Sequence, residues 1–170
     1  MEARAKLFGH PIHQMLIVLP LGSLTGAVIF DLLHLLTGGE QWALVSYWLI
    51  ALGVLSGLLA AVFGLADFTK IPSGTRAKRV GALHGVGNVI VVALFAVSWL
   101  LRRDAPTNPE TIAIVLSLAG GGLSMLTGWL GGELVDRMGV GVDDGANLNA
   151  PSSLSGAPPH PAHGGATAGD

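Results

Sequence analysis

Four long apolar segments constrain the fold of this chain more than any other feature of its sequence. They run approximately from residue 14 to 36, 42 to 66, 80 to 101 and 111 to 130. A helix of roughly 20 apolar residues crosses a bilayer core about 30 Å thick, so each segment is long enough to span a membrane. Only 12% of the residues are charged, about half the share in soluble domains. We therefore expect an integral membrane protein.

Short polar connections decide how these segments are arranged. Residues 37–40, 70–79 and 102–110 link them, and connections this short make consecutive helices antiparallel. The prediction is an all-α fold, an up-down four-helix bundle, formed by one membrane domain of residues 1–139. Residues 140–170 are rich in Gly, Ala, Ser and Pro, and we expect this low-complexity tail to be disordered. Its His-Pro-Ala-His sequence at 160–163 is attributed to that biased composition.

Basic residues are unevenly divided between the two ends of this bundle. Only Arg102 and Arg103 fall at the end opposite the termini. Cytoplasmic loops of membrane proteins carry an excess of Lys and Arg, so both termini and the 70–79 loop are expected to be cytoplasmic. The basic residues at the terminal end are Arg4, Lys6, Lys70, Arg76, Lys78, Arg79 and Arg137.

Composition also excludes several function classes. The net charge of −2 gives no indication of nucleic-acid binding. The absence of cysteine excludes disulfides, covalent CxxCH haem attachment, cysteine-ligated iron–sulfur clusters and thiol catalysis. The sequence contains neither a serine-nucleophile motif nor a phosphate-binding glycine loop, so hydrolase chemistry has little support. It leaves open whether the protein is an enzyme. Small residues recur at four-residue spacing in every span, which suits tight packing within the bundle or a homo-oligomer.

Histidines from the first and third spans are expected at the same end of the bundle. His10 and His13 flank Pro11 where the first span begins, and proline is favoured in the first turn of a helix. His84 and Asn88 lie one turn apart near the start of the third span, on one face. Both pairs therefore come to the cytoplasmic side.

Two carboxylates join this group through the same topology. Asp67 lies at the end of the second span and Glu133 at the end of the fourth. Ionisable groups at membrane depth are costly and often functional. Each residue alone also has a structural interpretation, as an interhelical hydrogen bond, an ion pair or a helix cap.

The first hypothesis for this cluster is a b-type haem in an electron-transfer subunit. Two imidazoles from different helices can ligate one iron from opposite faces, and His13 and His84 lie at the similar depth that this requires. Asn88 belongs to the same candidate site. His10 could replace a ligand or orient a propionate, and Arg79 and Lys78 could pair with propionates at the cytoplasmic surface.

Two further hypotheses remain open. The residues His10, His13 and His84 with Glu133 or Asp67 would suit a single zinc, iron or copper ion without haem. Alternatively the protein binds no cofactor and is a membrane scaffold or accessory subunit of a larger complex. The haem hypothesis implies redox partner proteins, and the scaffold hypothesis implies a stable membrane partner. All three hypotheses imply contact with the lipid bilayer.

Motifs at both ends of the spanning region resemble one known family. The entrance Gly9-His10-Pro11-Ile12-His13, the exit Gly128-Trp129-Leu130-Gly131-Gly132-Glu133-Leu134-Val135 and the following Gly139-Val140-Gly141-Val142 are similar to bacterial membrane proteins of domain-of-unknown-function family 2231. The resemblance covers roughly residues 7–142. It implies four transmembrane helices in a bacterial inner membrane, with no established activity.

The family also bears on the redox hypothesis. Some relatives carry a Rieske-type iron–sulfur domain after the fourth span, which implies an association with electron transfer. This chain has the low-complexity tail there instead. It also has Gln14 where relatives often have proline, and Met138 where many have histidine.

Overall fold

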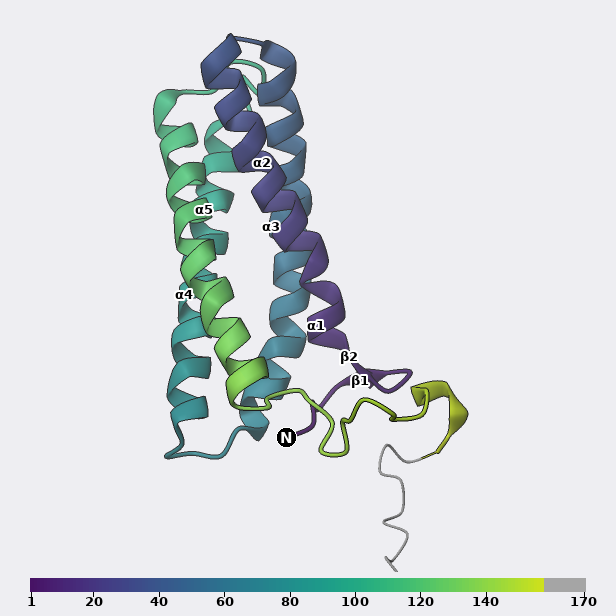
Figure 1. Cartoon of the computed structure of the whole chain (residues 1–170). Helices are drawn as coiled ribbons and strands as arrows, with labels where there is room; N and C mark the ends of the chain where they lie inside the picture. The colour runs from purple at the N-terminus through teal and green to yellow at the C-terminus, as the bar shows by residue number, and fades with distance from the viewer. Residues whose placement is uncertain (158–170) are drawn as a thin grey trace, which may run out of the picture.

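The chain forms an up-down bundle of four membrane-length helices (Figure 1). A computed structural model describes residues 1–157. The first span consists of α1 (Ile12–Leu16) and α2 (Val18–Thr37). The others are α3 (Glu40–Lys70), α4 (Arg76–Leu101) and α5 (Thr111–Gly132), the last continuing into a π-helical turn, η1 (Glu133–Arg137). A hairpin of β1 (Lys6–Leu7) and β2 (His10–Pro11) precedes α1, and a 3₁₀ helix, η2 (Ser153–Ser155), follows the bundle.

The predicted fold class is confirmed, and the helices extend beyond the apolar segments that indicate them. All four are long and apolar enough to cross a membrane. The first span divides at Ile17, in the turn before Pro20. Proline lacks the N–H that would bond to the carbonyl of Leu16, which weakens the helix there. Residues 140–157 of the tail that we expect to be disordered are described, with the 3₁₀ helix η2 and hydrogen bonds to the N-terminal segment. Residues 158–170, including the His160–His163 sequence, lie outside the described residues, and the disorder of the tail stays a prediction there.

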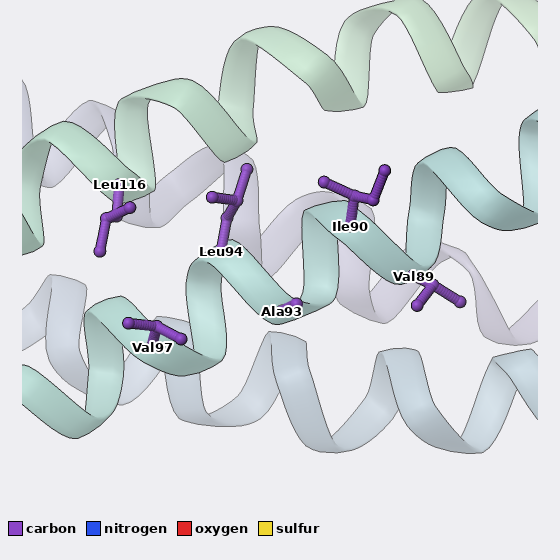
Figure 2. Close-up of a pocket in the computed structure, with 6 residues that line it drawn as sticks. All are labelled: Val89, Ile90, Ala93, Leu94, Val97 and Leu116. Carbon is purple, nitrogen blue, oxygen red and sulfur yellow. The ribbon is translucent and has the colours of Figure 1, made fainter.

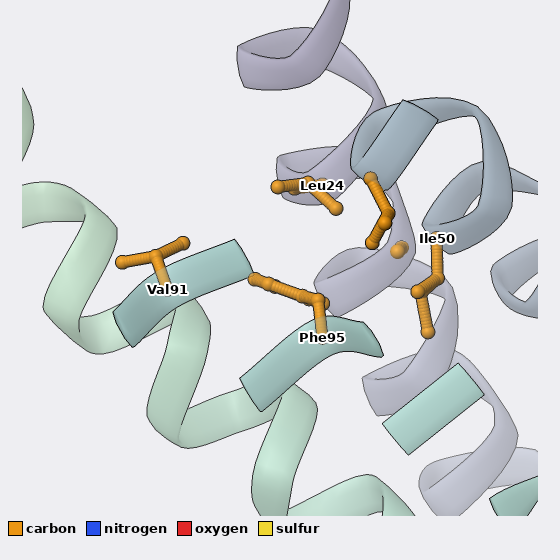
Figure 3. Packing of buried hydrophobic residues seen from close by; sticks show 6 residues of the cluster. Leu24, Ile50, Val91 and Phe95 are labelled. Atoms are coloured by element: carbon orange, nitrogen blue, oxygen red, sulfur yellow. The ribbon is translucent and has the colours of Figure 1, made fainter. Parts of the chain in front are cut away.

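The bundle is built from two helical hairpins. The first hairpin comprises α1, α2 and α3, and the second comprises α4 and α5. Packing is most extensive within each hairpin, and contacts of α3 with α4 and of α2 with α5 join the hairpins into a closed ring. A cluster of buried side chains fills the space between them (Figure 3): Leu24, Ala27, Ile50, Val54, Val91 and Phe95.

The same close packing recurs in both hairpins. A Cβ at Gly53 would lie 2.4 Å from the side chain of Leu24, and a Cβ at Gly120 would lie 2.8 Å from that of Phe95. Leu24 and Phe95 are 71 positions apart, and Gly53 and Gly120 are 67 apart. Because the hairpins run in the same direction and close a ring, an approximate half-turn about the bundle axis relates them. This internal repeat is not apparent from the hydropathy pattern and the motifs of the sequence.

A buried ion pair joins the four helices at the end opposite the termini. Arg102, directly after α4, and Asp31 of α2 are both completely buried. Arg102 donates from Nη1 to Asp31 Oδ1 at 2.6 Å and from Nη2 to Oδ2 at 2.8 Å. This bidentate geometry is the strongest form of such a pair. These residues are themselves 71 positions apart, so the ion pair joins equivalent positions of the two hairpins.

Hydroxyls from three helices complete this network. Arg102 also donates to Ser46 of α3 at 3.2 Å and to Ser117 of α5 at 3.1 Å, and Ser117 donates to Asp31. The Nε of Arg102 donates to Ser98 of α4 at 3.2 Å. An ion pair in an apolar interior is tolerated when its polar atoms are satisfied in this way. The network therefore holds all four helices at one end.

Breaking this pair is expected to destabilise the bundle strongly. Asp31→Asn leaves the guanidinium of Arg102 buried without a charged partner, which costs about 3–5 kcal/mol of unfolding free energy. The double variant Asp31→Leu/Arg102→Met should be less destabilised than Asp31→Asn, since no charge is then left unpaired. Denaturation in detergent, followed by circular dichroism, measures both.

Arg103→Met is the matched control for this experiment. The side chain of Arg103 is largely exposed, and within residues 1–157 its one ion-pair partner is the exposed Asp104, at 4.0 Å. Its removal should leave stability unchanged. Equal loss in the Arg103 and Asp31 variants would contradict the proposed role of the buried pair.

Candidate functional site

His13 is held against α3 by a hydrogen bond and by a glycine. Its Nδ1 lies 2.9 Å from the carbonyl oxygen of Ala60. A Cβ at Gly64, one turn further along α3, would lie only 2.8 Å from Cε1 of the ring. The glycine thus lets the imidazole lie directly on the helix backbone, and the carbonyl sets its rotation.

His84 has the same arrangement in the second hairpin. Its Nδ1 lies 2.8 Å from the carbonyl oxygen of Thr127 on α5. A Cβ at Gly131, again one turn further along, would lie 3.1 Å from Cε1 of the ring. The sequence separations equal those between the equivalent core residues. The two histidines are 71 positions apart, and the two carbonyl residues and the two glycines are each 67 positions apart.

This repeat brings the two imidazoles to the same depth in the bundle. Ala60 precedes Lys70, and Thr127 precedes Arg137, by ten residues each, or roughly 15 Å along a helix. Each ring lies against the helix that follows its own in the chain, His13 on α3 and His84 on α5. The prediction that the bundle carries these two histidines to one end is therefore correct.

The hydrogen bonds define the chemistry that the rings offer. A carbonyl oxygen only accepts, so each Nδ1 carries the proton and each Nε2 is left with a lone pair, which at His84 faces the Nδ2 of Asn88 at 3.1 Å. A backbone carbonyl bonded to the second ring nitrogen is the usual support of a metal-ligating histidine. Among the described residues, no hydrogen-bond partner occupies Nε2 of His13.

Polar side chains surround only one of the two rings. The Nδ2 of Asn88 donates to the backbone oxygen of His84 at 2.9 Å and lies 3.1 Å from its Nε2. Thr127 donates from Oγ1 to Asn88 Oδ1 at 3.0 Å. The equivalent positions beside His13 are Ile17 and Ala60, which offer no such groups. The site is therefore symmetric in its imidazoles and asymmetric in their neighbours.

The remaining candidate ligands have other partners. His10 lies in β2, exposed, with Nε2 3.3 Å from Ser153 Oγ. Asp67 accepts a hydrogen bond from the backbone N–H of Arg4 at 2.6 Å. Glu133 pairs with Arg76 at 2.8 Å.

The described residues contain no group of three or more His, Asp or Glu side chains arranged to hold a metal ion. Arg79 is exposed at the end of the bundle that carries Met1. Of the predicted set, the structure joins His84 and Asn88 by hydrogen bonds and places His13 at the same end of the bundle, against α3.

Sequence reasoning identified the histidines but missed what supports them. Gly64 and Gly131 each follow the residue whose carbonyl accepts the histidine hydrogen bond by four positions, and they belong to no recognisable motif. The internal repeat could have identified these glycines, because the histidines recur after 71 positions and the glycine and a small residue before it recur after 67 positions. Arg102 was assigned to the polar connection of residues 102–110, but the structure buries its side chain in the ion pair with Asp31.

A second surface feature has no polar chemistry. A shallow depression lies on the outer face between α4 and α5 (Figure 2), and its lining is entirely apolar. Val89, Ile90 and Val97 at its edge are largely exposed, as expected of a surface that contacts lipid tails. The other lining residues are Ala93, Leu94 and Leu116.

Fold and site together define a four-span helical membrane protein with paired imidazoles near one membrane surface. The chain matches the family of predicted membrane proteins called domain of unknown function 2231, over residues 9–144. It belongs to that family, as the motifs at the two ends of the spanning region predict. Neither the curated proteins nor the solved structures contain a match to it.

Methyl groups at the two glycines are expected to displace the imidazoles. Gly64→Ala and Gly131→Ala place a Cβ 2.8 Å and 3.1 Å from the rings of His13 and His84. Overpacking of this kind costs typically about 1–3 kcal/mol, and we expect the larger loss at Gly64. Denaturation in detergent measures the unfolding free energy.

Gly128→Ala provides the control, because no atom lies within 4 Å of a Cβ at that position. Alanine is the better helix former, so this variant should be neutral or more stable. Equal unfolding free energies of all three alanine variants would contradict close packing of the rings against Gly64 and Gly131.

Proposed function

We propose that His13 and His84 are the axial ligands of one b-type haem and that the protein is a redox-linked membrane subunit. His13 of the first hairpin and His84 of the second would hold the haem between them. A bound haem supplies a one-electron carrier, and the protein supplies its ligands, orientation and shielding from water. The observation that carries the proposal is the pair of imidazoles held through Nδ1 by equivalent carbonyls.

The state of the two rings supports this assignment. An iron ligand needs a neutral imidazole with a free nitrogen and a fixed orientation. The carbonyls of Ala60 and Thr127 fix the protonated nitrogen, and Gly64 and Gly131 fix the ring against its helix.

The approximate two-fold relation between the hairpins is a second argument. The two axial positions of a haem iron are alike and lie on opposite faces of a flat ring. Ligands related by a half-turn about the bundle axis approach such a ring from opposite sides at equal depth. Asn88 Nδ2, 3.1 Å from His84 Nε2, would have to leave that nitrogen while keeping its bond to the backbone oxygen of His84.

The basic end of the bundle suits the acidic groups of this cofactor. Propionates need water or cations, and within the described residues the exposed Arg79 has no ion-pair or hydrogen-bond partner for its side chain. Lys78 is less available, since its Nζ donates to the carbonyl of Phe68 at 2.7 Å and lies over the Phe68 ring. We therefore retain Arg79 as the propionate partner in this proposal.

Absorption spectra of the purified protein test the proposal. After expression with ample haem supply, the protein should show a Soret band, and His13→Ala and His84→Ala should each abolish it. His34→Ala is the matched control, because His34 also contacts a carbonyl, that of Gly39 at 3.1 Å, but at the opposite end. It should keep the band.

Three results would replace this proposal. A colourless protein with one equivalent of zinc, iron or copper, lost in His13→Ala, would indicate the non-haem site. A colourless, metal-free protein that co-purifies with a partner in fixed ratio would indicate a scaffold. A band that survives both histidine variants would place the haem elsewhere. Gel filtration in detergent checks that each variant remains folded.

Electron transfer at this site implies a partner at the basic end, which we propose is cytoplasmic in a bacterial inner membrane. The excess of Lys and Arg at that end supports this orientation. The chain has no cysteine, so a single introduced thiol reports one position. In intact cells, Ser73→Cys should resist a membrane-impermeant thiol reagent and Asp104→Cys should react. The opposite pattern would reverse the orientation.

A further inference from the structure

Two segments outside the spans form a platform at the basic end of the bundle. We define the interfacial platform as residues 1–11 and 139–157. Figure 1 shows the β1–β2 hairpin and the segment after η1 extending sideways from the base of α1, rather than continuing along the bundle axis. The platform therefore lies beside the end of a membrane span.

Hydrogen bonds join the two segments to each other and to the bundle. The amino group of Met1 donates to the carbonyl of Gly139 at 3.0 Å, and the N–H of Gly141 donates to the carbonyl of Met1 at 2.9 Å. The N–H of Ile12 donates to the carbonyl of Ala5 at 3.0 Å. At the far side, His10 Nε2 lies 3.3 Å from Ser153 Oγ.

An ion pair adds to this support. Lys6 donates to Glu2 at 2.8 Å and lies 3.6 Å from a carboxylate oxygen of Asp143. The hydrogen bond to Glu2 is the main reason that the pKa of Lys6 is raised, so this lysine stays charged at neutral pH. The platform is thus a defined element, fastened to the bundle at several points.

The platform exposes large apolar side chains. The exposed fractions are 46% for Leu7, 70% for Phe8 and 76% for Leu154, and Leu148 is completely exposed. Several large apolar side chains exposed on one small element indicate contact with a membrane or a protein.

Phe8 is the most informative of these residues, because its backbone is strained. It has φ +50°, and Gly9 after it has φ +83°. A two-residue hairpin turn with both φ values positive normally has Asn-Gly or Asp-Gly. A phenylalanine there costs stability and gains no packing inside the protein. Its side chain therefore has a role outside the folded chain.

The position of the hairpin identifies the surface that this side chain meets. β2 ends at Pro11, and the first membrane helix begins at the next residue, Ile12. The hairpin therefore lies at the boundary between lipid and water. Aromatic and aliphatic side chains inserted at this boundary anchor proteins to the membrane surface.

We propose that the interfacial platform lies on the bilayer and inserts Phe8, with Leu7, Leu148 and Leu154, among the lipid headgroups and upper acyl chains. It would fix the depth and tilt of α1, the helix that carries His13. The proposal is independent of whether the imidazoles bind a cofactor.

Charge on the platform indicates which force holds it there. Its formal charges cancel, with the Met1 amino group, Arg4 and Lys6 against Glu2, Asp143 and Asp144. Insertion would therefore depend on apolar burial and not on anionic lipid. Lipid binding that requires anionic headgroups, or that salt abolishes, would contradict this.

Spin labels on the cysteine-free chain test the proposal. The full-length Leu154→Cys protein is labelled and reconstituted in vesicles of phosphatidylcholine alone, or with added phosphatidylglycerol. We expect its label to collide more with oxygen, which enters lipid, than with a water-soluble nickel chelate, in both lipids. Labels at Leu58→Cys, on the exposed face of α3, and Ser73→Cys, in the loop before α4, give the lipid and water references.

Phe8→Asn in the Leu154→Cys background separates anchoring from folding. Asparagine suits the turn better than phenylalanine, so stability in detergent should be unchanged or higher. The label should nevertheless move from the lipid reference to the water reference. The proposal is overturned if the label at residue 154 already matches the water reference in the protein with Phe8, or still matches the lipid reference in the Phe8→Asn variant. A label shielded from both reagents indicates a protein partner or a second copy and also overturns it.

Discussion

The buried pair of Asp31 and Arg102 is the interaction on which the rest of the bundle depends. Long apolar helices in lipid have little reason to prefer one packing over another, because neighbouring side chains and lipid tails are equally apolar. A bidentate ion pair with hydroxyl partners from the other helices has one satisfactory geometry, and any rearrangement would leave a charge unpaired at membrane depth. The pair thereby fixes the register of both hairpins, including the opposite end, where the imidazoles lie.

The approximate half-turn between the hairpins connects these two ends. His13 and His84 are equivalent positions, and so are Asp31 and Arg102, so one axis passes through both pairs. At one end the equivalent residues have opposite charge and satisfy each other. At the other end they are identical, and two imidazoles that each present an Nε2 lone pair cannot satisfy each other in this way. The same symmetry therefore gives a self-sufficient ion pair at one end of the bundle and leaves the imidazoles at the other end available for a ligand.

The asymmetry around the two rings indicates where the hairpins have diverged. Asn88 and Thr127 form a hydrogen-bonded pair beside His84, where the first hairpin has apolar Ile17 and Ala60. The basic end is asymmetric as well, since only the first hairpin carries the β1–β2 strands and only the second ends in the π-helical turn of η1. These additions surround the candidate site without changing the glycine and carbonyl that hold each histidine.

The sequence by itself determined the membrane class, the number of spans, their antiparallel order and the meeting of His13 and His84 at one end. Hydropathy and loop length report these properties locally, so no tertiary information is needed. Only the tertiary structure decided that Asp67, Glu133 and His10 have other partners, that Arg102 turns inward, and that Gly64 and Gly131 receive the rings. Each of these depends on which side chain faces which across a helix interface. The hydrophobic pattern is too uniform to specify this, because nearly every face of these helices is apolar.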